Sequence, residues 1–303
     1  MTSFMFASQR IRVPASSANL GPGFDALDLA LQIYLECRFE PSQSLAITAQ
    51  GRDVGSIPLD DSNLIWQTAK RVAEAQQRQM PPLAIHISND IPVGKGLGSS
   101  AAALVAGVVM ASYALDLQWD AHKILDEAAR LEGHPDNVSA CVLGSATTAT
   151  ISADGITRAV RIEIPEAFSV AVVCPNFELP TTEMRAVLPD CYPKADAIFN
   201  LQRATLLVAA LATGNREAFP EAFEDRLHQP YRMARVPGME AILKLRAPGL
   251  LGCALSGAGP AILVFFDTGS EAVVDLVKAE FTRAGHASEV FFSAVDRSGL
   301  QIL

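Results

Sequence analysis

Charged side chains are scarce in this sequence, and basic ones are scarcer than acidic ones. Of the 303 residues, 19% are charged, and 24 lysines and arginines against 33 aspartates and glutamates give a formal net charge of −9. No run of basic residues occurs along the chain. Proteins that bind nucleic acid or an anionic membrane surface usually carry such a run. We therefore expect neither partner, and a bound phosphate would have to be held without a cluster of lysines.

The chain also lacks paired cysteines. Its five cysteines are odd in number, widely scattered and never in a CxxC pair: Cys37, Cys141, Cys174, Cys191 and Cys253. This pattern favours reduced, mostly buried thiols over disulfides or a metal site. The first residues, MTSFMFASQRIRV, have no basic segment before their short apolar run and no signal-peptidase site. A cytoplasmic location is the expectation.

Long hydrophobic runs are almost missing, although mean hydropathy is +0.22. A stretch of twenty uncharged residues, 96–115, is long enough to cross a bilayer at roughly 1.5 Å per residue. It holds three glycines, three serines and many alanines, and no basic loop flanks it to set an orientation. We interpret it as a helix of a protein core.

A chain of this length usually folds as two domains. Apolar and β-branched runs predict strands at 33–39, 45–49, 83–88, 146–152 and 169–174, and helices at 61–78, 99–115 and 120–131. The rest predicts helices at 194–213, 216–223, 238–246 and 271–284 and strands at 253–255, 261–266 and 288–295. Together these elements predict a mixed α/β chain. The composition changes near 155–165, so we expect domains 1–160 and 161–303 and a ligand site in the cleft between them.

The strongest local signal is the segment 91–103, IPVGKGLGSSAAA, placed between a predicted strand and a predicted helix. Its alternating glycines allow a tight turn that leaves free N–H groups at a helix N-terminus, an arrangement that binds phosphate. Its serines could cap the helix or offer a hydroxyl to Mg²⁺, and the plainer interpretation is a glycine-rich connection capped by Ser99 or Ser100. The P-loop GxxxxGK[ST] and the dinucleotide motif GxGxxG are both absent, which leaves a dehydrogenase, with Asp116 as its ribose-binding acid, only weakly supported.

Three further segments carry polar groups beside turns. VPASSANLGPGFD (13–25) holds Asn19 and Asp25 around a Gly-Pro-Gly turn, LSGAGPA (255–261) predicts a turn between two strands, and EGHPDNV (132–138) gathers two carboxylates, an imidazole and an amide. Taken alone, they predict a loop, a hairpin turn, and a helix that ends at Gly133 before a new one begins at Asp136.

In this order and spacing, the four segments resemble the signature motifs of the superfamily of galactokinase, homoserine kinase, mevalonate kinase and phosphomevalonate kinase (GHMP kinases). The resemblance runs from about residue 13 to residue 265, and the motif combination is most similar to the homoserine kinase branch. It implies an α+β protein with the two-domain GHMP-kinase fold, in which the N-terminal domain is like ribosomal protein S5 domain 2 and the C-terminal domain is ferredoxin-like. It also implies ATP and Mg²⁺ as cofactors, L-homoserine as substrate and a role in threonine biosynthesis.

The resemblance also implies roles for individual residues. Mg²⁺ would be held by Ser100, preferred to Ser99, and by Glu132. Homoserine would be bound by Asn19, Asp25, Asn137, Thr181, Arg185, Arg232 and the turn at Gly259. ATP would be bound by Asn63 near the adenine and by Pro92, Val93, Gly94, Lys95, Gly96, Leu97, Gly98, Ser99, Ser100, Ala101 and Ala102 around the phosphates.

The chemistry of homoserine is consistent with that set. Its carboxylate needs a cation, which Arg185 and Arg232 can supply, and its ammonium needs an anion such as Asp25. Thr181 and Arg185 lie four residues apart, on one face if that segment is helical. No residue stands out as a general base. Three alternatives remain: another GHMP kinase acting on mevalonate or a sugar, a non-catalytic nucleotide-binding module, and an oxidoreductase. The one candidate protein partner is a second copy of this chain, in a homodimer.

Overall fold

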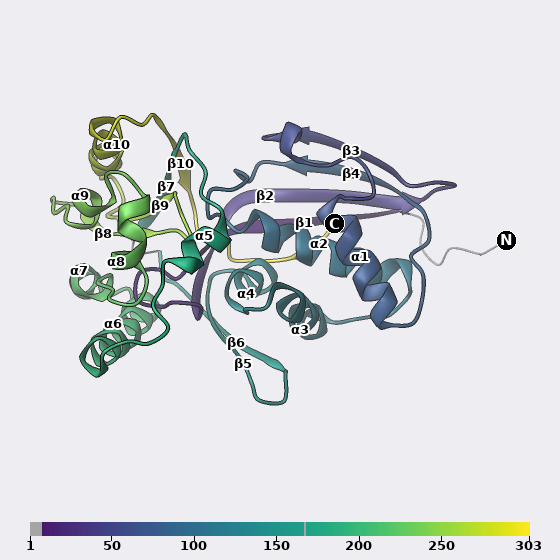
Figure 1. Ribbon diagram of the computed structural model, residues 1–303, viewed down its shortest axis with the longest axis horizontal. Helices are drawn as coiled ribbons and strands as arrows, with labels where there is room; N and C mark the ends of the chain where they lie inside the picture. Colours follow the sequence, from purple (N-terminus) through teal and green to yellow (C-terminus); the bar gives the residue numbers. More distant parts are fainter. Residues whose placement is uncertain (1–7, 167) are drawn as a thin grey trace.

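The computed structural model describes residues 8–166 and 168–303, which form two β-sheets with helices packed against them (Figure 1). In these residues, seven strands make the first sheet and four the second. The expectation of an α+β protein is confirmed. The first sheet takes its strands from the first half of the chain and from the last residues, and the second sheet lies wholly between them in sequence.

The first sheet runs in the order β11-β1-β2-β4-β3, with β5 paired to β2 and β6 to β5. Its strands are β1 (Gln9–Ala18), β2 (Leu27–Pro41), β3 (Ala46–Gly51), β4 (Leu83–Asn89), β5 (Ala146–Ile151), β6 (Thr157–Ile162) and β11 (Gln301–Ile302). The helices beside it are α1 (Leu64–Ala75), α2 (Ser99–Ala114), α3 (Ala121–Glu132) and α4 (Asp136–Leu143), and they pack on one side of the sheet (Figure 1).

The second sheet runs in the order β10-β7-β9-β8. Its strands are β7 (Ser169–Pro175), β8 (Leu250–Leu255), β9 (Ile262–Phe266) and β10 (Ser288–Ser293). The helices of this half are α5 (Thr181–Ala186), α6 (Lys194–Thr213), α7 (Phe219–Ala222), α8 (Gln229–Arg232), α9 (Met239–Leu243) and α10 (Val273–Arg283). Short 3₁₀ turns lie at Val54–Ser56, Arg216–Ala218 and Met233–Arg235.

Helix α2 accounts for most of the long uncharged stretch. Eleven of its sixteen residues are buried, and it packs against α1, α3, α4 and β1. Its small side chains let α1 come close: a Cβ at Gly107 would lie 2.5 Å from the backbone oxygen of Ile65. The stretch is therefore a core helix, as expected. Among the described residues, α2 is too short to cross a membrane, and one helix, α6, is long and apolar enough to do so by length and composition alone.

Replacing Gly107 with alanine is expected to lower the free energy of unfolding by about 1–3 kcal/mol, because the new methyl group would push α1 away from α2. Differential scanning calorimetry would show this as a melting temperature several degrees lower. Gly55→Ala is the matched control, because a Cβ there meets nothing within 4 Å and the residue has no positive φ. An equal change in both variants would contradict this account of α1–α2 packing.

Several predicted elements have other bounds in the structure. The segment 13–25 begins inside a strand, β1, that the sequence patterning missed, and the strand predicted at 33–39 begins earlier, at Leu27. The helix predicted at 216–223 is a 3₁₀ turn followed by α7, because Pro220 sits in its middle. Strand β6, near the predicted domain boundary, pairs with β5 in the first sheet. The division at 160/161 stays a prediction.

Candidate active site

The first half of the molecule is the first sheet with α1–α4, and the second half is the second sheet with α5–α10. A cavity of about 280 Å³ lies where turns and helices of both halves meet. It is bordered by the β1–β2 turn, the loop before α2, the α3–α4 turn, helices α5 and α8, and the β8–β9 turn. Of the predicted site residues, it is lined by Asn19, Asp25, Val93, Gly94, Gly96, Leu97, Gly98, Ser99, Ser100, Ala101, Glu132, Asn137, Thr181, Arg185, Arg232 and Gly259. The four sequence segments thus meet around one space.

The other predicted residues lie elsewhere. Ala102 is fully buried in the core. Pro92 and Lys95 line a neighbouring cavity between the two halves, and the Lys95 ammonium donates a hydrogen bond to the backbone oxygen of Phe177 at 2.8 Å. The Lys95 side chain is therefore committed to the second half of the molecule.

Asn63 lines a separate, mostly apolar cavity of about 190 Å³, which shares Val93, Ser99 and Ser100 with the first. Its amide is the N-cap of α1: the side-chain oxygen accepts from the backbone N–H of Ile65 at 3.0 Å, and the side-chain nitrogen donates to the oxygen of Pro58 at 2.7 Å. Asn63 therefore shapes the wall of this cavity, with its polar atoms already in use.

Backbone contacts hold the three glycine-containing turns together. The N–H of Ser16 donates to Leu97 O at 3.1 Å, and the N–H of Gly257 donates to Ala18 O at 3.0 Å. The hydroxyl of Ser256 donates to Gly96 O at 2.7 Å. Gly96 has φ +82°, and a Cβ there would lie 2.2 Å from the oxygen of Ser256, so only glycine allows this approach.

The loop before α2 presents a site for an anion. Gly98 is the N-cap of the helix, in the left-handed conformation and with no side-chain cap, so the alternative interpretation with Ser99 or Ser100 as the N-cap is wrong. Within the described residues, the backbone N–H groups of Ser99, Ser100 and Ala101 meet no acceptor. These donors and the positive end of a sixteen-residue helix border the cavity.

Glu132 and the serine hydroxyls have the chemistry of a magnesium site. No other residue in the described part of the chain forms a hydrogen bond or ion pair with the Glu132 carboxylate. The pKa of Glu132 is raised, mainly by burial. Ser99 and Ser100 likewise have side-chain oxygens without partners there. Mg²⁺ prefers oxygen ligands and is commonly held by one or two carboxylates with substrate phosphates, so these residues fit it.

Arg185 and Asp25 do not stand apart, as their separate predicted roles would suggest, but pair with one another. Both terminal nitrogens of Arg185 lie 3.0 Å from the carboxylate oxygens of Asp25. This ion pair joins the two halves of the molecule at the edge of the cavity. Thr181 begins α5 and Arg185 lies in its last turn, so the expected helical spacing is confirmed.

Arg232 is a buried cation that forms no ion pair with an acidic side chain in residues 8–166 and 168–303. It is 2% exposed; its Nε donates to Met184 O at 3.1 Å, and its Nη1 donates to Gly257 O at 3.1 Å. Nη2 forms no hydrogen bond within the described residues. Burial, together with the charge of Arg185, lowers the pKa of Arg232 to about 10, so it is still a cation at neutral pH. A buried guanidinium with a free donor favours a bound anion.

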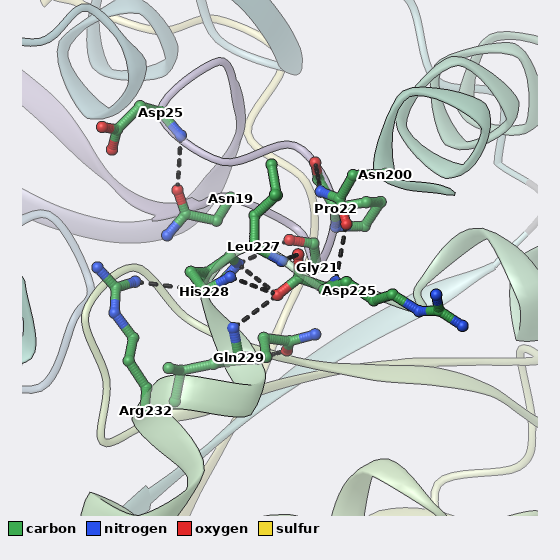
Figure 2. Close-up of polar contacts among 12 residues, drawn as sticks. Asn19, Gly21, Pro22, Asp25, Asn200, Asp225, Leu227, His228, Gln229 and Arg232 are labelled. Carbon is green, nitrogen blue, oxygen red and sulfur yellow. Dashed lines mark hydrogen bonds and ion pairs between the residues drawn. The ribbon is translucent and has the colours of Figure 1, made fainter. Parts of the chain in front are cut away.

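The two asparagines are used differently. Asn19 accepts from the backbone N–H of Asp25 at 3.0 Å (Figure 2). Its side-chain nitrogen donates to Gly257 O at 3.0 Å, so its amide closes the β1–β2 turn against the β8–β9 turn. Asn137 donates to the hydroxyl of Ser16 at 2.8 Å, and its amide oxygen, which meets no donor among the described residues, can accept a hydrogen bond at the cavity.

His134 and Asp136 line the cavity and were given no role from the sequence. The Nδ1 atom of His134 lies 2.5 Å from Asp136, which also accepts from the backbone N–H of Asn137 at 2.8 Å. The clustering of polar groups in EGHPDNV was the available signal, but it did not show which of them would face the cavity.

Comparisons with known families agree with this architecture. The family model described as "GHMP kinases N terminal domain" matches residues 63–145, and the one described as "GHMP kinases C terminal" matches residues 207–285. The chain belongs to the GHMP kinase family. The predicted family and its two-domain fold are therefore confirmed.

Individual relatives within the GHMP kinases are more specific. A homoserine kinase of Solibacter usitatus is 60% identical over 292 residues, covering 96% of each chain. The crystal structure of homoserine kinase from Cytophaga hutchinsonii superposes with a TM-score of 0.85 at 26% identity, covering 100% of this chain and 99% of that one. Mevalonate kinase of L. major, in complex with R-mevalonate, is 16% identical with a TM-score of 0.72 over 99% and 100% of the chains, which shows a shared fold.

Proposed function

We propose that this GHMP kinase transfers the γ-phosphoryl group of ATP to the hydroxyl group of L-homoserine, giving O-phospho-L-homoserine in threonine biosynthesis. One observation carries the proposal beyond the names of the relatives. A single cavity has an anion-binding helix N-terminus at one part of its wall and side-chain charges of both signs, Asp25, Arg185 and Arg232, at another. A polyanion and a small zwitterion would be bound side by side.

The nucleotide belongs on the side of α2. The loop 92–102 would surround its phosphates through backbone N–H groups and the helix dipole, which explains how an acidic protein holds a polyanion. The adjoining apolar cavity with Asn63 in its wall would take the adenine. Because Lys95 is bonded to the second half of the molecule, its contribution to phosphate binding would come from the backbone.

The amino-acid end of homoserine would be read by the charged residues. The Asp25–Arg185 pair offers an anion for the ammonium and a cation for the carboxylate, and Arg232 adds a second cation through its free Nη2. Thr181, Asn19 and the turn at Gly259 would complete the wall. The free amide oxygen of Asn137 would accept a hydrogen bond from the substrate hydroxyl and so orient a lone pair of that hydroxyl oxygen.

Ser100 and Glu132 would hold Mg²⁺ together with the nucleotide phosphates. When bound, the ion would neutralise charge on the transferring phosphoryl group. The chain itself would act mainly by positioning: the α2 N–H groups fix the phosphates, and Arg185, Asp25 and Asn137 fix the acceptor hydroxyl. We assign no general base, because a loose phosphoryl-transfer transition state needs little proton removal in advance.

The finer expectations about partners and location also belong to the proposal. We propose a cytoplasmic enzyme with L-homoserine as its small-molecule partner, with no nucleic-acid or membrane partner, and with a homodimer as the assembly to test. The low count of basic residues supports the first two exclusions.

An ADP-release assay with homoserine, mevalonate, galactose or no acceptor, each with and without Mg²⁺, tests the function. We expect ADP release only with homoserine and Mg²⁺, and one phosphate ester per ADP by ³¹P NMR. Release with mevalonate or galactose instead would assign the chain to another GHMP activity. Nucleotide binding without turnover on any acceptor would contradict an enzymatic role.

A further inference from the structure

A fully buried histidine joins the turn after β1 to the buried arginine of the site. His228 precedes α8 and its side chain is 0% exposed. Its Nε2 atom lies 2.7 Å from the backbone oxygen of Gly21, and its Nδ1 atom lies 3.1 Å from Nη1 of Arg232 (Figure 2). Neither the sequence motifs nor the proposed chemistry assigns this residue a role.

The two partners of His228 fix its protonation state. A carbonyl oxygen can only accept, so Nε2 must carry a proton and donate it to Gly21. A guanidinium can only donate, so Nδ1 must be unprotonated and accept from Arg232. The ring is therefore a neutral imidazole with its proton on Nε2. Burial lowers the pKa of His228 more than the nearby Asp225 carboxylate raises it, which agrees with a neutral ring.

Other contacts hold the imidazole in this place. The carboxylate of Asp225 accepts from the backbone N–H groups of His228 at 3.0 Å and Gln229 at 2.6 Å, so it fixes the start of α8. The Phe24 ring stacks on the imidazole with ring centroids 5.2 Å apart, and the Arg232 guanidinium lies 5.4 Å from the same Phe24 ring. His228 and Arg232 thus share one aromatic neighbour from the turn that carries Asp25.

We propose that His228 is a positioning residue for substrate binding. It accepts from Nη1 of Arg232 and donates to Gly21, so it fixes the guanidinium relative to the β1–β2 turn. It thereby sets where the free Nη2 meets the substrate carboxylate. This inference rests on the proposed function. It gives the enzyme a means to hold in one orientation a buried cation that forms no ion pair with a carboxylate in the described part of the chain. An acidic partner at this place would compete with the substrate for Arg232.

Two substitutions separate the two bonds of the imidazole. In His228→Gln, the side-chain amide can reach the position of Nε2 and keep the donor to Gly21, but the acceptor for Arg232 is lost. In His228→Asn, the amide oxygen lies near the position of Nδ1 and keeps that acceptor, while the bond to Gly21 is lost. We expect His228→Gln to raise the KM for homoserine about tenfold to a hundredfold, the usual effect of losing a hydrogen bond to a charged group.

The KM for ATP is expected to stay near the wild-type value in both variants, and His228→Asn should retain most of the homoserine affinity. In an Arg232→Met background, His228→Gln should have almost no further effect on the KM for homoserine, because the two residues act as one unit. Equal effects of the two His228 variants, or a full effect of His228→Gln without Arg232, would overturn the inference.

Gln229→Met is the matched control for a purely structural role. Gln229 is buried next to His228, at the start of α8, and its side-chain oxygen accepts from the backbone N–H of Leu255 at 2.9 Å. Its replacement should therefore lower the melting temperature without a selective change in the KM for homoserine. The ¹⁵N NMR spectrum of the substrate-free wild type should show His228 neutral and protonated on Nε2 at pH 7. A wild type inactive on homoserine would overturn the proposed function and this inference with it, whereas an active wild type with a charged His228 would overturn the inference alone.

Discussion

Replacing Glu132 with glutamine is expected to lower kcat about a hundredfold to a thousandfold, the usual effect of removing one charged stabiliser of the transition state. Glutamine keeps the size of the side chain but removes the negative charge that fits Mg²⁺. The concentration of Mg²⁺ at half-maximal rate should rise at the same time. The KM for homoserine should change little, because the substrate charges face other residues. Initial rates over a magnesium titration measure all three quantities.

Glu127→Gln is the matched control for that prediction. Glu127 lies on the same helix and is buried, but its carboxylate is paired with Arg130. We expect this variant to keep the wild-type kcat and the wild-type magnesium dependence, with at most some loss of stability. An unchanged magnesium titration in Glu132→Gln, or an equal fall in kcat in both variants, would remove Glu132 from the metal site.

The sequence predicted the site segments well because the features that define them are local. The glycines at 96 and 98, the end of α3 at Gly133 and the β8–β9 turn each depend on the conformations that a few neighbouring residues allow. Each predicted turn is found at the predicted place. The helical spacing of Thr181 and Arg185 follows in the same way from neighbours four residues apart.

Features that depend on tertiary contact could not be predicted in this way. Residues Val13–Ala18 of β1 lie buried against β2 and the helices, so they lack the alternation that marks a half-exposed strand, and Pro14 further weakens the signal. The partners of Asn63 and Lys95 are not coded by their motifs: one side chain caps a helix, and the other bonds to Phe177 across the two halves.

The Asp25–Arg185 pair shows the same limit at the site itself. The sequence assigned each residue to one charge of the substrate, but the two lie 160 positions apart and nothing in the local pattern places them in contact. The structure shows that they neutralise each other before substrate binds. The cost of removing either one is therefore larger than the loss of a single substrate contact.

Replacing Arg185 with alanine is expected to raise the KM for homoserine about a hundredfold, with the KM for ATP close to that of the wild type. The two charge-assisted hydrogen bonds that the guanidinium would make to the substrate carboxylate are lost, each worth about 1.5–3 kcal/mol. Exposure of roughly a third of the Arg185 side chain reduces their sum. The unpaired Asp25 carboxylate then repels the substrate carboxylate. Steady-state kinetics with each substrate varied in turn measure the split.

A double-mutant cycle separates the two causes. If part of the loss in Arg185→Ala comes from the unpaired Asp25, then adding Asp25→Asn should recover some of the affinity for homoserine, and the two changes will not be additive. Arg216→Ala is the control for removal of an arginine from an ion pair, because Arg216 pairs with Asp267 at 2.7 Å and does not line the cavity. It should leave both KM values unchanged. Equal losses for homoserine and ATP in Arg185→Ala would instead place Arg185 in the general architecture of the cleft, and Arg232 would then be left as the sole cation for the substrate carboxylate.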